Sequence, residues 1–265
     1  MRIYTIIIIA CMLAVASLWL GGLTPWGRKK GALGALLSLG VAGALLLLAV
    51  LPGNSFYGPT LTKVDTGGKK LVALTFDDGP YGRYTEELLE LLSREQVRVT
   101  FFLVGENALQ APELVQREAA LGHEIALHAH VHQDLLKLDR QALRENIHRG
   151  KETVDKLVPQ PVRYMRPPHG FRDWQVQEEI QAAGLRVVNW SVIPRDWTNP
   201  GAEVIAERVC ANVEPGAIVL LHDGDSPWGR SSRQQTITAT AQIIQRLRGQ
   251  GYEFVTISEL LAAAQ

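Results

Sequence analysis

Residues 71–80 read LVALTFDDGP, an apolar run that ends in two adjacent carboxylates, Asp77 and Asp78, and a Gly-Pro turn. A short apolar run that stops at turn residues is typical of a buried strand. Similar runs recur along the chain, and together they predict seven strands, at 71–77, 100–105, 124–128, 163–167, 186–192, 217–222 and 253–257.

Helical patterns fill the intervals, at 85–96, 112–121, 139–157, 174–183, 203–212 and 235–248, and a last one follows at 258–264. Gly122, Gly184 and Gly251 each stand just after a predicted helix, where a helix stop is expected. Strands that alternate with helices form a parallel sheet with helical crossovers. A closed eight-fold barrel typically needs about 250 residues, and the body at 70–265 is shorter. We therefore predict an incomplete (β/α)7 barrel, with an open doubly wound sheet as the alternative.

The first 52 residues have a different character from this body. Two uncharged apolar runs occupy 3–23 and 31–51, and a bilayer-spanning helix needs about 20 such residues. Gly34, Ser38 and Ala42 recur every four residues in the second run, a spacing that lets helices approach closely in lipid. We predict a hairpin of two transmembrane helices in residues 1–52, followed by a linker at 53–69. For the first run, the alternative is a cleaved signal peptide.

Charge is distributed unevenly along the chain. It has 27 basic and 27 acidic residues, but residues 1–52 contain four basic residues and no acid. Arg28, Lys29 and Lys30, with Trp26, lie in the predicted loop between the apolar runs, and basic loops stay cytoplasmic. The body is therefore expected outside the cytoplasm, anchored in the cell membrane. Residues 53–265 have 23 basic and 27 acidic residues, and this net charge of −4 gives no electrostatic reason to expect nucleic-acid binding.

Reactive side chains gather at the end of the third predicted strand. His128, His130 and His132 alternate there, and in an extended strand all three would point the same way. Neutral imidazole is a common ligand for zinc, nickel or cobalt, and one carboxylate with two imidazoles leaves positions open for water and substrate. The alternative is a solvated or pH-sensitive histidine cluster. His123 and His148 stand apart, and we interpret both as surface residues.

Other predicted strands end in similar segments. Asp77 and Asp78 can divide the holding of a cation and the handling of a proton between them, although an Asp-Gly turn with a helix cap would look the same. Chemistry belongs at the carboxyl ends of parallel strands. Three further predicted strand ends carry such segments: Arg166-Pro167-Pro168-His169-Gly170, Arg195-Asp196-Trp197 and Leu220-Leu221-His222. Each segment alone could be a structural ion pair, but together they predict one site.

This ordered set of segments resembles the polysaccharide deacetylase family, which is carbohydrate esterase family 4 and is also called the NodB homology domain. The resemblance covers about residues 71–261 and includes the closing segment GYEFVTISEL at 251–260. It implies a distorted, incomplete barrel. It also implies that Asp77 is the catalytic base and that a divalent metal ion binds to Asp78, His128 and His132. Zinc is the favoured ion, with cobalt, nickel and manganese as alternatives.

The resemblance implies further roles at the other strand ends. Arg166 would keep Asp77 ionised. His222 would protonate the leaving amine, and Asp196 would stabilise its imidazolium form. The backbone N–H near His169 would serve the oxyanion, and Trp197 would offer a flat wall to a sugar or else be a core residue. The residues expected to contact substrate are Pro168, His169, Trp197 and Leu220.

The chain departs from the family pattern at three positions. Ala129 stands where a Ser or Thr usually follows the first metal-binding histidine. His169 replaces a usual aromatic residue, and Ile193 stands where an Asp often begins the fourth motif. The first departure removes a supporting hydrogen bond, and the third is expected to change substrate contacts more than chemistry.

The predicted function is metal-dependent, hydrolytic removal of N-acetyl groups from an amino-sugar polymer. Peptidoglycan N-acetylglucosamine is the favoured substrate, and chitin-type oligosaccharides come next. Two alternatives stay open: O-deacetylation of an acetylated glycan, and a non-catalytic glycan-binding pseudoenzyme. A metal-dependent peptidase has no support, because the chain lacks a His-Glu-x-x-His segment.

Overall fold

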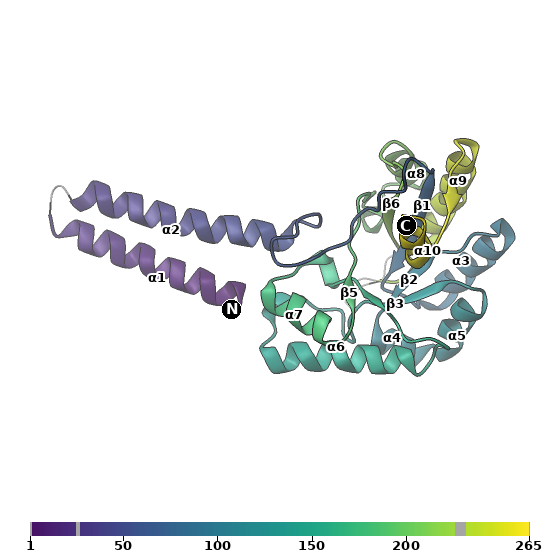
Figure 1. Ribbon diagram of the computed structural model, residues 1–265, viewed down its shortest axis with the longest axis horizontal. Helices are drawn as coiled ribbons and strands as arrows, with labels where there is room; N and C mark the ends of the chain where they lie inside the picture. The colour runs from purple at the N-terminus through teal and green to yellow at the C-terminus, as the bar shows by residue number, and fades with distance from the viewer. Residues whose placement is uncertain (1, 25–26, 226–231, 265) are drawn as a thin grey trace.

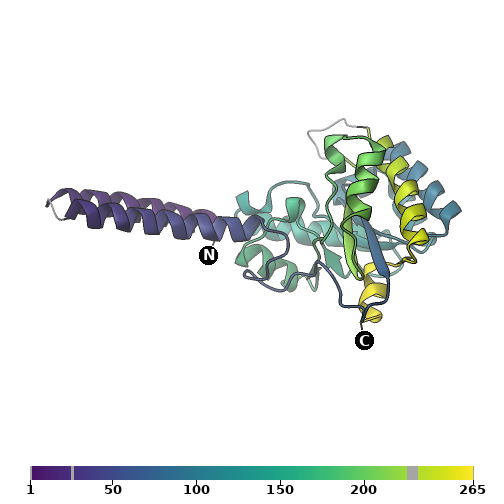
Figure 2. The same ribbon diagram turned by 90° about the horizontal axis from the view of Figure 1, so that it is seen from above.

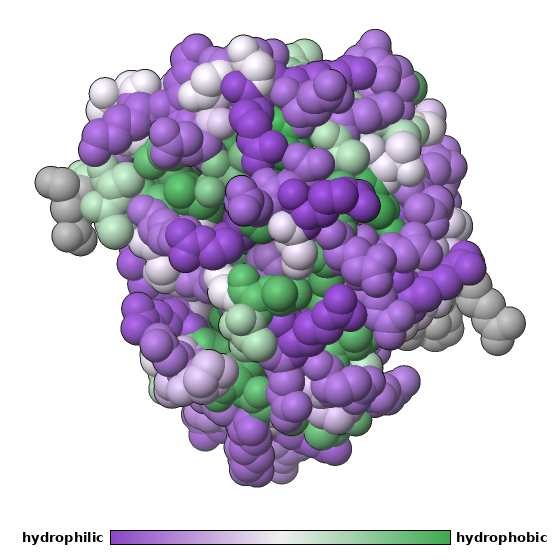
Figure 3. Space-filling view, turned by 90° about the vertical axis from the view of Figure 1, so that its right-hand side faces the viewer, coloured by the Kyte–Doolittle hydropathy of each residue, from purple (hydrophilic) through white to green (hydrophobic). Residues whose placement is uncertain are grey.

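The computed structural model describes residues 2–24, 27–225 and 232–264. A long helical hairpin projects from one side of an α/β body (Figure 1), and the view from above shows the same arrangement (Figure 2). The face of the body turned away from the hairpin is mostly hydrophilic, with apolar residues in small groups (Figure 3). The two parts therefore present contrasting surfaces.

The hairpin consists of α1 (Ile3–Gly22) and α2 (Gly27–Val50), which lie side by side along their lengths. Both are long and apolar enough to cross a membrane by length and composition. Small residues form the contact, and two of the three predicted positions take part in it: Ala42 is buried, and a Cβ atom added to Gly34 would lie 3.0 Å from Ser17 Oγ. The buried positions of α2 are Gly31, Ala35, Ala42 and Ala49, and they face those of α1, which include Ala10, Ala14 and Gly21.

The basic residues at the far end of the hairpin are helical, which corrects one prediction. Arg28, Lys29 and Lys30 belong to the first turn of α2, because this helix begins at Gly27, and they do not form a loop. Trp26 lies outside the described residues.

The body is built on one parallel sheet. Its strands are β1 (Leu71–Asp77), β2 (Thr100–Leu103), β3 (Glu124–Leu127), β4 (Tyr164–Met165), β5 (Arg186–Val187), β6 (Ala217–His222) and β7 (Glu253–Phe254). They lie in the order β5-β4-β3-β2-β1-β6, and β7 pairs with the beginning of β1. The run from β1 to β5 follows chain order, as in a barrel. It does not reverse direction, as a doubly wound sheet does.

The sheet curls until its two sides nearly meet. Beyond β5, Val192 forms a single parallel bridge with Val219 of β6, and the backbone N–H of Leu220 donates to the carbonyl of Val192 at 2.9 Å. The predicted incomplete barrel is therefore confirmed, and the open doubly wound alternative is wrong. The strands β4, β5 and β7 are shorter than predicted because the chain leaves the ladder after two residues.

Helices cover the outer face of the sheet. They are α3 (Gly82–Glu95), α4 (Gly105–Gln110), α5 (Pro112–Ala120), α6 (Arg140–Asp155), α7 (Trp174–Ala182), α8 (Ala202–Cys210) and α9 (Gln234–Gly249). The last helix, α10 (Ile257–Ala262), packs instead against the inner cluster through Ile257 and Leu260. Gly122, Gly184 and Gly251 follow α5, α7 and α9 with φ of 81°, 74° and 85°, the left-handed conformation that stops a helix. The sequence did not predict α4, which begins at Gly105, the end of the second predicted strand.

Residues 53–69, predicted as a linker, are attached to the body. Leu61 forms a parallel bridge with Val188, and Lys63 forms an antiparallel bridge with Ala217. Tyr57 and Val64 are buried. The hairpin and the body are therefore joined by an ordered segment.

Alternation along β1 separates two apolar clusters. Val72, Leu74 and Phe76 belong to the cluster shared with the outer helices. Ala73 belongs to the inner cluster, with Phe102, Ala126 and Ile218 of neighbouring strands. Because side chains alternate along a strand, Asp77 shares the inner face with Ala73. The fold therefore places the last residue of β1 at the mouth of the barrel.

Candidate active site at the barrel mouth

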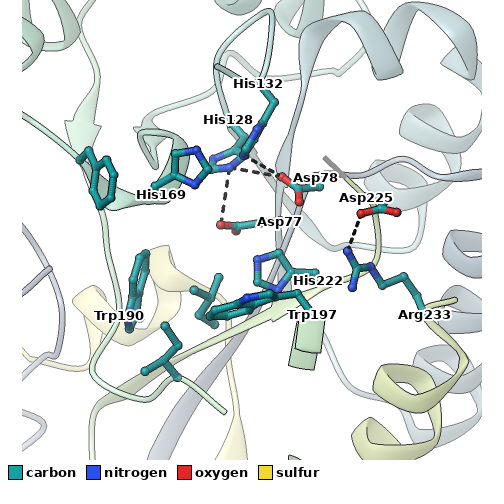
Figure 4. A pocket seen from close by; sticks show the side chains of 13 residues that line it. Asp77, Asp78, His128, His132, His169, Trp190, Trp197, His222, Asp225 and Arg233 are labelled. Carbon is teal, nitrogen blue, oxygen red and sulfur yellow. Dashed lines mark hydrogen bonds and ion pairs between the residues drawn. The ribbon is translucent and has the colours of Figure 1, made fainter. Parts of the chain in front are cut away.

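Two adjacent strands, β1 and β6, end in reactive side chains at the same level. Asp77 closes β1, His222 closes β6, and the two residues are direct register partners. Both line a pocket of about 560 Å³ at the mouth. Figure 4 shows these side chains converging with three more from the loops after β1 and β3.

Asp78 follows Asp77 in a left-handed conformation, with a φ of 73°. This turn brings its carboxylate beside two histidines. The Oδ1 atom lies 3.4 Å from Nε2 of His128 and 3.3 Å from Nε2 of His132. One potential ligand atom from each of the three residues lies within 4.8 Å of the others.

The donor set fits a divalent cation. Asp78 Oδ1 is buried and has no hydrogen-bond partner among the described residues. His128 Nδ1 pairs with the backbone carbonyl of Arg166 at 2.7 Å, an arrangement that leaves Nε2 to face the site. Burial, with the nearby His132 and Arg166, holds the pKa of His128 well below its ordinary value. A neutral imidazole and a carboxylate oxygen without a partner are the state that a metal site requires.

His130 does not point the same way as its neighbours, which corrects the alternation expected for a strand. The strand β3 ends at Leu127, and Ala129 takes a φ of 69°. This left-handed residue turns His130 away. A Cβ atom added to Gly105 would lie 2.5 Å from His130 Nδ1, and one added to Gly150 would lie 2.7 Å from its backbone nitrogen. His130 is therefore packed between two glycines and does not line the pocket.

The prediction that His123 lies on the surface was also wrong. His123 is buried, and its Nδ1 accepts the backbone N–H of Val99. Burial, with a smaller effect of Arg98, lowers its pKa to about 4. His148 is exposed, as predicted.

Arg166 lies beneath Asp77 and is fully buried. Its Nη1 donates to Asp77 Oδ1 at 2.5 Å and to Thr75 Oγ1 at 2.9 Å, and its guanidinium lies over the ring of Phe102. Burial nevertheless raises the pKa of Asp77 to about 6, because desolvation outweighs the opposing effect of Arg166. The ion pair therefore orients Asp77 and lowers its pKa as expected, but burial outweighs this effect.

Asp196 plays the corresponding part behind His222. Its Oδ1 pairs with His222 Nδ1 at 2.8 Å, and its Oδ2 accepts the backbone N–H of His222 and the hydroxyl of Thr236, both at 2.9 Å. Burial lowers the pKa of His222, but the negative charges of Asp196, Asp78 and Asp77 raise it by more. The net result is a pKa of about 9. His222 is therefore a protonated imidazolium near neutral pH, with Nε2 left to act.

The pocket walls combine predicted and unpredicted residues. His169, Trp197 and Leu220 line the pocket as expected, whereas Pro168 is buried and is not among the lining residues. His169 has a φ of 62°. The Trp197 side chain is 39% exposed, and its ring lies edge-on to His222 with centroids 5.2 Å apart, so it is a wall of the site.

Several lining residues were missed or only partly anticipated. Phe171, Trp190, Asp225 and Arg233 were not predicted, and Ile193 was noted only as a departure. Arg233 is buried, and its Nη2 pairs with Asp225 at 3.0 Å, while its Nη1 has no hydrogen-bond partner among the described residues. Asp225 stands three residues after His222, a signal that could have been used. Arg233 immediately precedes α9, so only the tertiary fold reveals its place.

This arrangement can perform a hydrolysis. Three potential ligand atoms lie close together, the Asp77 carboxyl group lies beside them, and the His222 ring lies beyond Asp77 (Figure 4). A base, an acid and a site for a Lewis acid are the groups that add water to an acyl carbon and release an amine or alcohol.

Comparison with known proteins gives a consistent result. The family model described as polysaccharide deacetylase matches residues 64–188. A peptidoglycan-N-acetylglucosamine deacetylase of Bacillus cereus is 40% identical over 195 residues, which are 73% of this chain and 89% of the relative. A chitooligosaccharide deacetylase of a Bradyrhizobium species is 37% identical over 203 residues, 74% of this chain and 93% of the relative.

Solved structures share the fold. The Bc1960 peptidoglycan N-acetylglucosamine deacetylase superposes with a TM-score of 0.71 at 32% identity, covering 77% of this chain and 92% of that one. A carbohydrate esterase family 4 pseudoenzyme from Bacillus anthracis superposes with a TM-score of 0.69 at 27% identity, covering 77% of this chain and 69% of that one. Both active and inactive proteins therefore use this architecture.

Proposed function

The chain belongs to the polysaccharide deacetylase family, and from this premise we propose that it hydrolyses N-acetyl groups of an amino-sugar polymer. The observation that carries the proposal is the meeting of Asp77, His222 and three potential metal ligands in one pocket. Peptidoglycan N-acetylglucosamine is the favoured substrate, followed by chitin-type oligosaccharide.

The family is metal-dependent, and we assign the ion to Asp78, His128 and His132, with zinc as the favoured metal. When bound, such an ion lowers the pKa of water and polarises a carbonyl. The hydrogen bond from His128 Nδ1 to the carbonyl of Arg166 keeps this ligand in its metal-binding tautomer.

Asp77 is the proposed base. Its carboxylate accepts a proton from the water that attacks the acetyl carbon, and Arg166 holds the carboxylate in place. The backbone N–H near His169 is proposed to donate to the oxyanion that develops on the acetyl oxygen. The left-handed conformation of His169 fits a backbone specialised for such a contact.

His222 is the proposed acid. It donates its proton to the nitrogen as the carbon–nitrogen bond breaks, so that acetate and a free amine leave. Asp196 stabilises the imidazolium and fixes the ring, as a carboxylate does in a hydrolase triad. Trp197 and Trp190 supply flat walls for the sugar.

We propose that α1 and α2 anchor the body in the cell membrane, with the body outside the cytoplasm. Each helix exposes large apolar side chains along most of its length, and these need lipid around them. The basic first turn of α2 lies at the end of the hairpin farthest from the body, where the cytoplasmic side is expected.

Acetate release by the full-length protein tests the proposal. The substrates are peptidoglycan, chitooligosaccharide and acetylxylan, with the protein in detergent or vesicles. Acetate from the N-acetylated glycans is expected. Release from acetylxylan alone would identify an O-deacetylase instead.

A pseudoenzyme is the second candidate, because a pseudoenzyme stands among the similar structures. The residues of this chain oppose it, since a glycan-binding module has no need for a buried base, a paired acid and a metal triad together. A protein that binds metal and glycan but releases no acetate from any substrate would establish this candidate.

A further inference from the structure

We infer that the enzyme deacetylates a saccharide while it is still carried on a membrane lipid. This inference rests on the proposed deacetylase activity and on the proposed membrane anchor. It deepens both, because it follows from how the hairpin is attached to the body.

Arg172 fastens the end of α2 to the body. It is fully buried, and its guanidinium donates to the carbonyls of Leu51, Pro52 and Asn54 and to Thr60 Oγ1. Its backbone N–H donates to the carbonyl of Ala49 at 3.0 Å. A helix ends with unsatisfied carbonyls, and here the body supplies their partners.

Asp173 fastens the start of α1 in the same way. Its buried carboxylate accepts the backbone N–H of Ile3 at 3.2 Å and Nη1 of Arg2 at 3.3 Å, and it also caps α7 by accepting the N–H of Val176. The other Nη of Arg2 donates to the carbonyl of Leu135. Both helices of the hairpin are therefore held by the body, so it is fixed at two points.

The lipid-facing surface begins directly at this junction. Ile3 is buried in the core of the body, whereas the next residue, Tyr4, is 38% exposed. Leu51 is 42% exposed, and on the body Phe56 and Trp174 are 50% and 39% exposed. Phe56 and Trp174 contact each other with ring centroids 5.4 Å apart. Aromatic side chains gather at membrane–water interfaces, so this side of the body is expected to rest on the bilayer.

The loops that hold the hairpin are the loops that build the site. Leu135 follows the proposed ligand His132 by three residues, and Arg172 follows His169 by three. Three residues of chain span at most about 11 Å. Arg172 Nη1 also donates to the carbonyl of Gly170, next to His169. The rim of the pocket formed after β3 and β4 therefore lies close to the membrane.

A body held in this way works at a fixed height. A flexible tether would let the pocket search a volume above the membrane, but here the connecting segment is hydrogen-bonded to the body. The nearest glycan is then one attached to the bilayer itself. The chemical class is an N-acetylated amino-sugar oligosaccharide on a lipid carrier, and finished wall polymer is the competing substrate.

The inference is tested by measuring how the rate of acetate release depends on the height of the glycan above the bilayer. The full-length protein is reconstituted in vesicles that contain synthetic glycolipids, in which an N-acetylglucosamine oligomer is joined to the acyl chains by inert spacers of increasing length. Acetate release should be fastest with a short spacer and should fall by about tenfold or more with a long one, because the effective concentration at a fixed site falls as the tether lengthens. Free sacculi should release acetate more slowly than the short-spacer glycolipid.

A variant whose body is no longer fixed to the hairpin, called the freed body, supplies the comparison. In one variant, 20 Gly/Ser residues are inserted between Pro52 and Gly53 and combined with Arg172→Gln and Asp173→Asn, because the Arg172 guanidinium otherwise still holds Leu51 and Pro52 on the hairpin side of the insert. Asp173→Asn keeps a cap for α7 and removes the charge that pairs with Arg2. The insert spans roughly 25 Å on average, so the dependence on spacer length should flatten. The matched control carries the same insert between Gly67 and Gly68, which are exposed and lie after the attachment points, so it should behave as the native chain.

Three outcomes would overturn the inference: equal rates of the native chain at every spacer length, a freed body that keeps the native dependence, or sacculi processed as fast as the short-spacer glycolipid. The same insert with Arg172→Lys, which keeps the buried charge but removes the guanidinium that holds Leu51 and Pro52, repeats the comparison if the first variant does not fold. Soluble chitooligosaccharide separates this failure from failure of the proposed function. If every version releases acetate from it, the chemistry stands and only the membrane substrate is wrong.

Discussion

Asp77 and His222 are register partners at the ends of the adjacent parallel strands β1 and β6, so their side chains enter the pocket from the same level. Each has a buried partner beneath it, Arg166 for the carboxylate and Asp196 for the imidazole. The register pairing therefore places the proposed base, Asp77, and the proposed acid, His222, one strand spacing apart. Of the metal triad, Asp78 directly follows Asp77 at the end of β1, and His128 and His132 come from the loop after β3.

The base can be removed without the metal ligands. We predict that Asp77→Asn keeps near-stoichiometric metal while kcat falls by about 10²–10⁴, the usual effect of losing a positioned base. The reason is that Asp78, not Asp77, lies between the two histidine Nε2 atoms. Metal analysis and acetate release on one preparation check both parts. Loss of metal from Asp77→Asn would contradict this division.

The two neighbouring histidines should respond differently to substitution. We predict that His132→Ala loses the metal and that His130→Ala retains it, because His130 packs against Gly105 and Gly150 outside the pocket. His130→Ala should still lower thermal stability, since it leaves a cavity. Metal titration of both variants is the measurement. Retention by His132→Ala with loss by His130→Ala would show that the triad is assigned wrongly.

Gly150 holds the histidine loop in place from α6. A Cβ atom there would lie 2.7 Å from the backbone nitrogen of His130 and 2.9 Å from the backbone carbon of Ala129. We predict that Gly150→Ala costs about 1–3 kcal/mol of unfolding free energy and weakens metal binding, because the backbone between the ligands must move. Gly249→Ala is the matched control, since its Cβ would meet nothing within 4 Å and it lies in α9. Equal melting temperatures for the two variants would count against the crowding argument.

The parts of the fold that could be predicted are those with strong local patterns. The bounds of β1 and β6 agree with the sequence at both ends, because each is a continuous apolar run buried by helices and by the barrel interior. By contrast, β5 was expected to reach residue 192 and ends at Val187. Residues 188–192 are still partly bridged, but to Leu61 and Val219, and such distant partners leave no local signal.

The site shows the same division. Asp77, Asp78 and His222 were predicted because strand ends are visible in the sequence. The prediction that His130 points the same way as His128 and His132 was wrong. It assumed an unbroken strand with side chains alternating every two residues, and the left-handed Ala129 interrupts that strand. The joint between hairpin and body had no recognised signal either. Arg172 was unremarked in a segment that reads as a plain helix start, and its carbonyl partners come from about 120 residues earlier.

The orientation of the hairpin can be measured directly. A reporter fused after residue 265 should be active only outside the cytoplasm, because the basic turn of α2 favours the cytoplasmic side. The mature chain should begin near residue 1, since Ile3 is buried in the body and its N–H pairs with Asp173. Reporter activity in the cytoplasm would reverse the orientation. A mature chain that lacks α1 would instead support the signal-peptide alternative.

The proposed acid, His222, should determine how the rate depends on pH. His222 has a pKa raised to about 9, with burial opposing and Asp196 as the largest raising cause. A group whose pKa is raised stays protonated below that value, so the rate should hold through neutral pH and fall as pH rises through about 9. Asp196→Asn removes the charge that sustains the imidazolium, and burial then acts with less opposition.

We therefore predict that the alkaline limb of kcat in Asp196→Asn moves down toward the ordinary histidine value of 6.5, with metal content unchanged. The stability of the native protein should follow the same sign: the contribution of the pair is complete below pH 6.5 and is lost as pH rises through about 9. Thr236→Val is the control, because it removes one hydrogen bond to Asp196 and leaves the charge. Its alkaline limb should stay near that of the native protein. If Asp196→Asn also keeps the native limb, a group other than His222 protonates the leaving nitrogen.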